Sequence, residues 1–267
     1  MDFAASEILI QLYLNVDVFM AVFVRIMGLF IILPVLSGQS IPLSARIILA
    51  LGIAILAFVG NIVTLPPYDP TLLGFALMIM QEFMVGLIIG LVVMMVFSMF
   101  HFVGQMIDFQ MGFGMVTVFD PFAQQQTPIT GNLYFLIVSL FFVMTGALRY
   151  VLGIFFQSFE LIGLGQAHVL GNVALADQVV YIIVGYFHLG LRIALPIVGT
   201  ILIVDVVLGI LVKAVPQMNV FVVGLPIKVS LGLIIIFLTM PFLADAFGMI
   251  MEDIVFSIGR MIMGMVP

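Results

Sequence analysis

Four ionisable side chains inside long apolar runs are the residues of this sequence most able to do chemistry: Arg25, Glu82, Arg192 and Asp205. A charge at the centre of a membrane helix costs at least ~2.5 kcal/mol, so it usually faces a partner or a water-filled cavity. Two interpretations are open, a proton relay or ion pairs that fix subunit register. A relay needs carboxylates and histidines repeated at helical spacing, and the three histidines here are far apart. Structural ion pairs are therefore favoured.

The charges near the C-terminal half cannot pair along one helix. Asp205 and Lys213 are separated by about 80° around a helix and about 12 Å along it. Their partners must lie on other helices or on other chains. We therefore predict that six charges take part in contacts between subunits: Arg25, Glu82, Arg192, Asp205, Lys213 and Lys228.

Composition restricts the class of protein. Of the 267 residues, 65% are hydrophobic and 7% are charged, whereas soluble domains have roughly a quarter charged residues. This composition predicts a protein of a membrane or of a membrane assembly. The net charge is −6 and the seven basic residues are scattered, so no basic face for nucleic acid is expected. Asp2 and Glu7 stand where a cleaved signal peptide would carry basic residues, so we expect no such signal.

Motifs of familiar enzymes do not occur in the sequence. There is no GxxxxGK[ST], HExxH, GxSxG or complete GxGxxG, and there is no cysteine. We predict a protein that is not an enzyme, with no catalytic residue, cofactor or metal site. If the protein moves a substrate, the energy must come from elsewhere.

The elements that must position these charges are six apolar runs. They cover Val18–Leu36, Ile47–Leu65, Leu72–Phe100, Ile129–Phe156, Val179–Val215 and Val229–Phe247. As single helices the third and fifth would be about 43 and 55 Å long, whereas a hydrocarbon core is roughly 30 Å thick. Basic residues in the connections weakly favour six simple spans with both termini outside. The length of these two runs conflicts with that model. We expect a kink at Pro196.

Smaller signals describe the connections. The last two runs should form a helical hairpin, and Gly248–Pro267 reads as a separate amphipathic end helix. Gly86 and Gly90 have the GxxxG spacing that permits close approach of helices, although chance explains such a match equally well among 25 glycines.

One stretch, from His101 to Pro128, resembles neither a membrane helix nor an ordinary loop. It interleaves glycines, which free the backbone, with bulky apolar side chains. It could be a deformable stopper in a pore, or a buried connection that only packs. The stopper interpretation predicts a plug made of Met106, Phe109, Met111, Gly112, Phe113, Gly114, Met115 and Phe119.

Three parts of the sequence resemble one family. They are GQMIDFQMGFGMVTVFDP (Gly104 to Pro121), the segment Leu195 to Lys228 with its PQMNVF and GLPIK blocks, and the early Arg25 with the turn from Pro42 to Arg46. Together they resemble the FliR/SctT family of flagellar type III export-gate proteins, over nearly the whole chain.

The resemblance implies an all-α fold of membrane-associated helical hairpins. Residues 1–180 would be similar to FliP and include a plug loop at 104–128, and residues 181–267 would form a FliQ-like hairpin and an amphipathic C-terminal helix. A single copy would assemble with FliP and FliQ into a cone-shaped gate raised above the bilayer plane. Such a gate would lie in the bacterial inner membrane, at the flagellar basal body.

The implied partners are FliP, FliQ, FlhB and FlhA, unfolded flagellar subunits as export substrates, and membrane lipids, with no nucleic acid. The alternative from another class is a self-contained secondary transporter with broken helices. Pro196 and the intramembrane charges favour that alternative, and the size of the extracted complex would distinguish the two.

Overall fold

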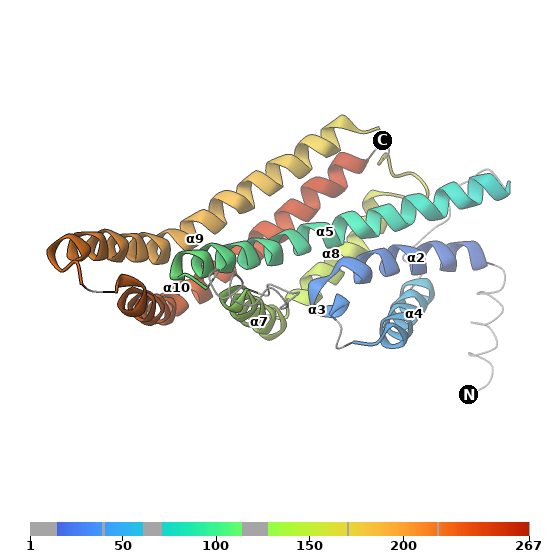
Figure 1. The fold of residues 1–267 in the computed structure, drawn as a ribbon. Helices are drawn as coiled ribbons and strands as arrows, with labels where there is room; N and C mark the ends of the chain where they lie inside the picture. The colour runs from blue at the N-terminus through green and yellow to red at the C-terminus, as the bar shows by residue number, and fades with distance from the viewer. Residues whose placement is uncertain are drawn as a thin grey trace. The chain divides into compact units, whose positions relative to one another are not determined.

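The computed structural model describes residues 15–38, 41–60, 71–113, 128–169, 171–217 and 219–266. All regular structure in these ranges is helical (Figure 1). The helices are α2 (Val16–Ile32), α3 (Pro34–Ser37), α4 (Leu43–Val59), α5 (Leu72–Met111), α7 (Ile129–Met144), α8 (Ala147–Leu161), α9 (Val173–Ala214) and α10 (Val220–Met265). The predicted all-α, membrane-type fold is confirmed.

Three helices are long and apolar enough to cross a membrane. α5, α9 and α10 have 40, 42 and 46 residues, so each is about 60 Å long or longer. A fourth span is possible if α7 and α8, which meet at 67°, cross together. The described residues therefore do not contain six helices of that length, in agreement with the conflict noted from the length of the runs. One reason is that the first two apolar runs form helices of only 17 residues, α2 and α4.

α5 continues beyond the end predicted for it. We predicted an irregular stretch from His101, but the helix runs to Met111. Val103, Ile107 and Met111 are buried at a spacing of four residues, which continues the packed face of the helix. Gly104 serves close packing, because a Cβ there would overlap the backbone of Gly131 in α7.

The C-terminal tail also differs from the prediction. Gly248–Pro267 is not a separate helix, since α10 is continuous from Val220 to Met265. Ile254, Ile258 and Met261 are fully buried and keep the helical spacing of apolar side chains through the tail. Nothing in that pattern changes at Gly248, so no new helix starts there. α9 likewise continues through Pro196, and the predicted kink stays a prediction.

The chain divides into two compact units. Unit 1 consists of Met1–Met95, Gly146–Ile183 and Glu252–Pro267, and unit 2 of Val96–Thr145 and Val184–Met251. In unit 1, α2 packs closely on the first half of α5. A Cβ on Gly28 would lie 2.5 Å from the carbonyl oxygen of Phe83, and one on Gly86 would overlap the carbonyl group of Arg25. The GxxxG spacing thus serves packing within one chain.

Unit 2 is held by aromatic side chains of α5, α7 and α10. The ring of Phe97 lies 5.5 Å from that of Phe135 and 5.8 Å from that of Phe142, measured between centroids. Phe141 meets Phe247 of α10 at 5.6 Å. Edge-to-face and offset contacts of this kind add about 0.5–1.5 kcal/mol each beyond the burial of area. They fix the C-terminal part of α5, which positions the site described below.

Candidate functional site

Two groups of charged residues stand out, one in each unit. The first, the buried charge cluster, centres on Arg25 of α2 and Glu82 of α5. Arg25 Nε lies 2.5 Å from Glu82 Oε2, and both side chains are 0% exposed. A pair taken out of water to this degree is stable only if its remaining polar atoms also find partners.

Those partners are present. The two terminal nitrogens of Arg25 donate to Ser158 Oγ (3.0 Å) and to the carbonyl oxygen of Ile162 (3.5 Å). Glu82 Oε1 accepts from the backbone N–H of Gly165 (2.8 Å). The guanidinium also lies 4.1 Å from the ring centroid of Phe159. The cluster therefore joins α2, α5, α8 and the segment after α8 inside one chain.

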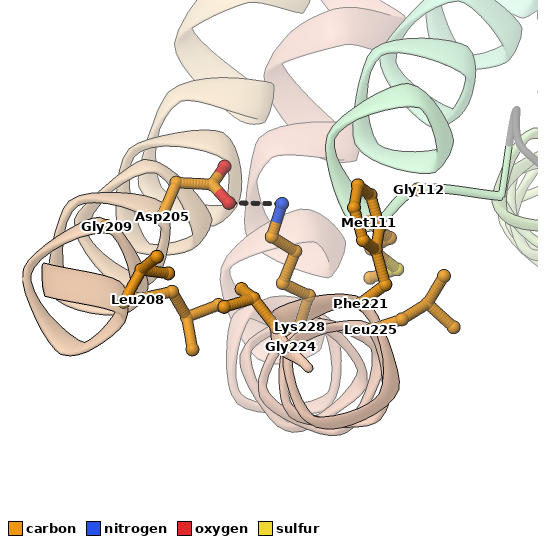
Figure 2. Close-up of a pocket in the computed structure, with 11 residues that line it drawn as sticks. Met111, Gly112, Asp205, Leu208, Gly209, Phe221, Gly224, Leu225 and Lys228 are labelled. Atoms are coloured by element: carbon orange, nitrogen blue, oxygen red, sulfur yellow. Dashed lines mark ion pairs between the residues drawn. The ribbon is translucent and has the colours of Figure 1, made fainter. Parts of the chain in front are cut away.

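The second group, the hairpin site, lies where α9, α10 and the end of α5 meet in unit 2. Asp205 of α9 forms an ion pair with Lys228 of α10, and their side chains point toward one another across the hairpin (Figure 2). Gln110 of α5 donates from Nε2 to Asp205 Oδ2 (3.1 Å). The side chains of Lys228 and Asp205 are 22% and 35% exposed. The requirement that Asp205 pair with another helix is thus met within the chain.

A cavity of about 280 Å³ opens beside this ion pair. Since a water molecule occupies about 30 Å³ of liquid volume, the cavity has room for several waters or for a side chain of a partner. Its lining is apolar apart from the ion pair, and consists of Met111, Gly112, Asp205, Leu208, Gly209, Val212, Val220, Phe221, Gly224, Leu225 and Lys228 (Figure 2).

The end of α5 is a defined helix stop. The backbone N–H of Phe113 donates to the carbonyl oxygen of Asp108 (3.0 Å), and that of Gly112 donates to Phe109 (3.2 Å). Gly112 has φ +89, so the two bonds and the left-handed residue form a Schellman motif. Only glycine takes this conformation without strain. Gly112 therefore fixes where the chain leaves the helix.

Asp108 is a buried residue beside the site that the sequence reasoning missed. Its carboxylate is buried and accepts hydrogen bonds from the backbone N–H of Thr130 (3.0 and 3.1 Å) and from its hydroxyl. Thr130 lies in the first turn of α7, where a carboxylate also complements the helix dipole. Asp108 thus ties the end of α5 to the start of α7. The available signal was a single acid in an apolar segment.

The predicted plug residues divide between two environments. Met106, Gly112 and Phe113 are half-buried, Phe109 is 79% exposed and Met111 is fully buried. Met111 packs against Gly232 of α10. The other three predicted plug residues, Gly114, Met115 and Phe119, lie outside the described residues.

The other two predicted charges stand apart from both groups. Arg192 and Lys213 are exposed, and neither has an ion pair among the residues that the structure describes. Within the same residues no group of three histidines, aspartates or glutamates could hold a metal ion. This arrangement of charges can hold helices together. It also leaves charged and apolar surface that partners could contact.

Comparison with known proteins agrees with the resemblance seen in the sequence. The family model "Bacterial export proteins, family 1" matches residues 16–254. The chain belongs to this family. Among its members, the flagellar biosynthetic protein FliR of Bacillus subtilis (strain 168) is 31% identical over 83% of this chain and 85% of its own.

Other members match over similar lengths. FliR of Aquifex aeolicus (strain VF5) is 31% identical over 89% of this chain and 88% of its own, and FliR of Escherichia coli (strain K12) is 26% identical over 82% and 83%. The family model spans both Arg25–Glu82 and Asp205–Lys228. Both charged groups therefore lie in the part of the chain that matches the family model.

Proposed function

We propose that this chain is a core subunit of the flagellar type III protein export gate. With FliP and FliQ it forms the channel for unfolded flagellar subunits, in the bacterial inner membrane at the flagellar basal body. FlhB and FlhA of the same apparatus are further partners. Support comes from the family match and from relatives that are flagellar biosynthetic proteins named FliR.

The observation that carries the proposal is the bare apolar surface of α9 and α10. Only 17% of the most apolar 18-residue window of each helix is buried within the chain, against 56% for α5. Phe221, Phe237 and Phe242 of α10 are among the exposed side chains. Soluble monomers rarely leave such continuous apolar surface uncovered. Partner subunits and lipid would cover it.

The domain division of the proposal follows from the same hairpin. Residues 1–180 would correspond to FliP and residues 181–267 to FliQ. In support, α9 and α10 are two long helices joined by a short connection after Ala214. Residue 180 lies within α9, so the proposed boundary falls inside a continuous helix.

The proposal also assigns a plug to the last residues of α5 and the segment that follows them. Met106 to Phe122 would close the channel with apolar side chains, which exclude water and ions when packed together. Asp108 and Thr130 support this assignment, because their hydrogen bonds tie the end of α5 to the start of α7 and so anchor the helices on both sides.

Composition of the purified complex tests the assembly. The tagged chain, expressed with FliP and FliQ and extracted in detergent, should elute as a large hetero-oligomer that contains both partners. The tagged chain expressed alone is the control for aggregation. A monomer or homodimer from cells that contain both partners would contradict the gate and support the secondary transporter.

Ion leakage tests the plug separately. Phe113→Ala, or shortening the segment, should leave the complex assembled and raise leakage of small ions across the membrane of expressing cells. Leu136→Ala, an exposed apolar residue of α7, is a control for loss of apolar surface. Conductance equal to wild type at normal complex levels would show that the segment only packs.

A further inference from the structure

A second polar site lies in unit 1, where the start of α9 meets the end of α10. Arg260 of α10 is held between two aromatic rings, 4.9 Å from the centroid of Tyr181 and 4.6 Å from that of Phe256. Arginine stacks on aromatic faces and keeps its N–H groups available in the plane of the guanidinium. The contacts with the two rings restrict the orientation of the guanidinium.

Two polar atoms at this site are buried without a partner among the described residues. They are Nε of Arg260 and Oε1 of Gln178. A buried donor or acceptor that loses its hydrogen bond typically costs about 1–3 kcal/mol, and such atoms in native proteins require an explanation. A ligand that offers an acceptor to Arg260 and a donor to Gln178 would provide it.

The site has a rigid frame. Asn172 Nδ2 donates to the carbonyl oxygen of Gly264 (2.7 Å), and the backbone N–H of His168 donates to Met265 (3.0 Å). Gly264 leaves room for Gln178, since a Cβ there would lie 2.7 Å from Gln178 Oε1. The two helix ends are therefore tied together around the polar atoms, and the frame does not depend on a ligand.

A cavity of about 260 Å³ adjoins these groups, lined by Asp177, Gln178, Tyr181, Ile182 and Arg260. It holds one cation and one carboxylate, which form no ion pair with each other. At about 30 Å³ per water, its volume suits a group of several atoms. Its charges suit a ligand that carries both a negative and a positive group.

Apolar surface surrounds the site. Val180, Tyr181, Phe256 and Met263 are exposed large side chains on the same two helix segments. Tyrosine at the end of an apolar helix is typical of the membrane interface, and basic pockets between membrane helices bind lipid headgroups. A ligand with a polar head and long apolar chains would cover both the site and its surroundings.

We propose that the Arg260 site binds a zwitterionic phospholipid headgroup, a phosphate with an attached primary ammonium. The phosphate oxygens accept from Arg260. The ammonium donates to Gln178 Oε1 and lies near the carboxylate of Asp177. A carboxylate from a partner protein would satisfy Arg260 alone and would be repelled by Asp177, so the lipid is the better fit. This inference is independent of the proposed export function.

Native mass spectrometry of the detergent-extracted protein, together with any subunits that co-purify, tests the proposal. Phosphatidylethanolamine, phosphatidylglycerol and phosphatidylcholine would be added in turn. Wild type should retain one phosphatidylethanolamine per chain about tenfold more tightly than the other two, as expected for one charge-assisted hydrogen bond. Phosphatidylglycerol has no ammonium, and phosphatidylcholine has no N–H to donate.

Single substitutions show which residue of the site contacts which part of the headgroup. Arg260→Gln should weaken retention of phosphatidylethanolamine about tenfold, and Arg260→Lys should weaken it less because the charge remains. Asp177→Asn should mainly reduce the preference over phosphatidylglycerol. Arg149→Gln is the matched control, because Arg149 also lies over a tyrosine ring, that of Tyr150 at 5.8 Å, but does not line this cavity. Its retention should equal that of wild type.

Four outcomes would overturn the proposal. Equal retention of phosphatidylethanolamine by wild type and Arg260→Gln would show that Arg260 does not bind the headgroup. The absence of a preference among the three lipids would contradict the proposed recognition of the ammonium. Loss of a co-purifying subunit from Arg260→Gln with unchanged lipid would assign Arg260 to a partner carboxylate instead. Full competition by soluble phosphoethanolamine at the same concentration as the lipid would show that the ligand is a soluble phosphate ester and not a membrane lipid.

Discussion

Helix α5 and the α9–α10 hairpin are similarly apolar but are covered differently. α5 has 56% of its most apolar window buried within the chain, and its charge, Glu82, is fully enclosed with Arg25. In α9 and α10 the share is 17%, and the pair Asp205–Lys228 is partly exposed. α5 is thus packed more fully in its own chain, whereas the hairpin presents surface that other molecules must cover.

This difference also separates two uses of an ion pair. A fully buried pair is weak evidence of net stability, but removal of one partner leaves an uncompensated buried charge. A partly exposed pair is weakened by solvent and contributes little. Removal of one charge should therefore cost much more stability in the buried charge cluster than in the hairpin.

The largest expected effect is at the buried charge cluster. Glu82→Ala should destabilise the protein by about 3–5 kcal/mol, because Arg25 would remain buried without its counter-ion. Thermal unfolding of the detergent-extracted protein measures this. The double substitution Arg25→Met with Glu82→Leu removes both charges and should lose less stability. If the single substitution is as stable as wild type, the cluster does not hold unit 1 together.

A smaller effect is expected at Asp108. Asp108→Ala should lose about 1.5–3 kcal/mol, since the hydrogen bonds from Thr130 are made to a charged carboxylate. Ion leakage should rise as well if the ends of the plug segment must stay joined. Asp245→Ala, an exposed acid of α10, is the control. Unchanged unfolding in Asp108→Ala would contradict the role of this contact.

Substitution of Gly112 should act on the backbone. Gly112→Val puts a β-branched residue at φ +89, which costs roughly 1–3 kcal/mol. The end of α5 would then shift, and export should slow while the seal is kept. Gly209→Val, a control outside positive φ on the same cavity, should have less effect. The rate at which cells with equal complex levels secrete a flagellar subunit measures the effect. Normal export by Gly112→Val would contradict the hypothesis that the plug segment moves.

The smallest effect on the chain itself is expected at the hairpin. Asp205→Ala should change the unfolding free energy by up to about 1 kcal/mol, because the pair with Lys228 is partly exposed. If partner subunits contact this site, Asp205→Ala should reduce recovery of the intact complex by more than its small loss of unfolding free energy explains. Co-purification with FliP and FliQ, compared with wild type, tests this. Recovery equal to that of wild type would limit Asp205 to its own hairpin.

Sequence alone determined the class of the protein and where its charges had to be satisfied. Its composition and apolar runs required membrane-type helices, and charges such as Asp205 could not pair along their own helix. The family motifs around Gly104 and Asn219 led to the export family that the comparison shows. These features are local or compositional, so they can be recognised without knowledge of the fold.

Only the tertiary structure decided the partners. Arg25 meets Glu82 across 57 residues, and Gly104 is needed for contact with Gly131 rather than for a flexible loop. The role of Asp108 depends on Thr130, which lies 22 residues away. Helical periodicity shows which face of a helix is apolar, but the identity of the neighbour depends on how distant segments pack, and one sequence does not contain that information in local form.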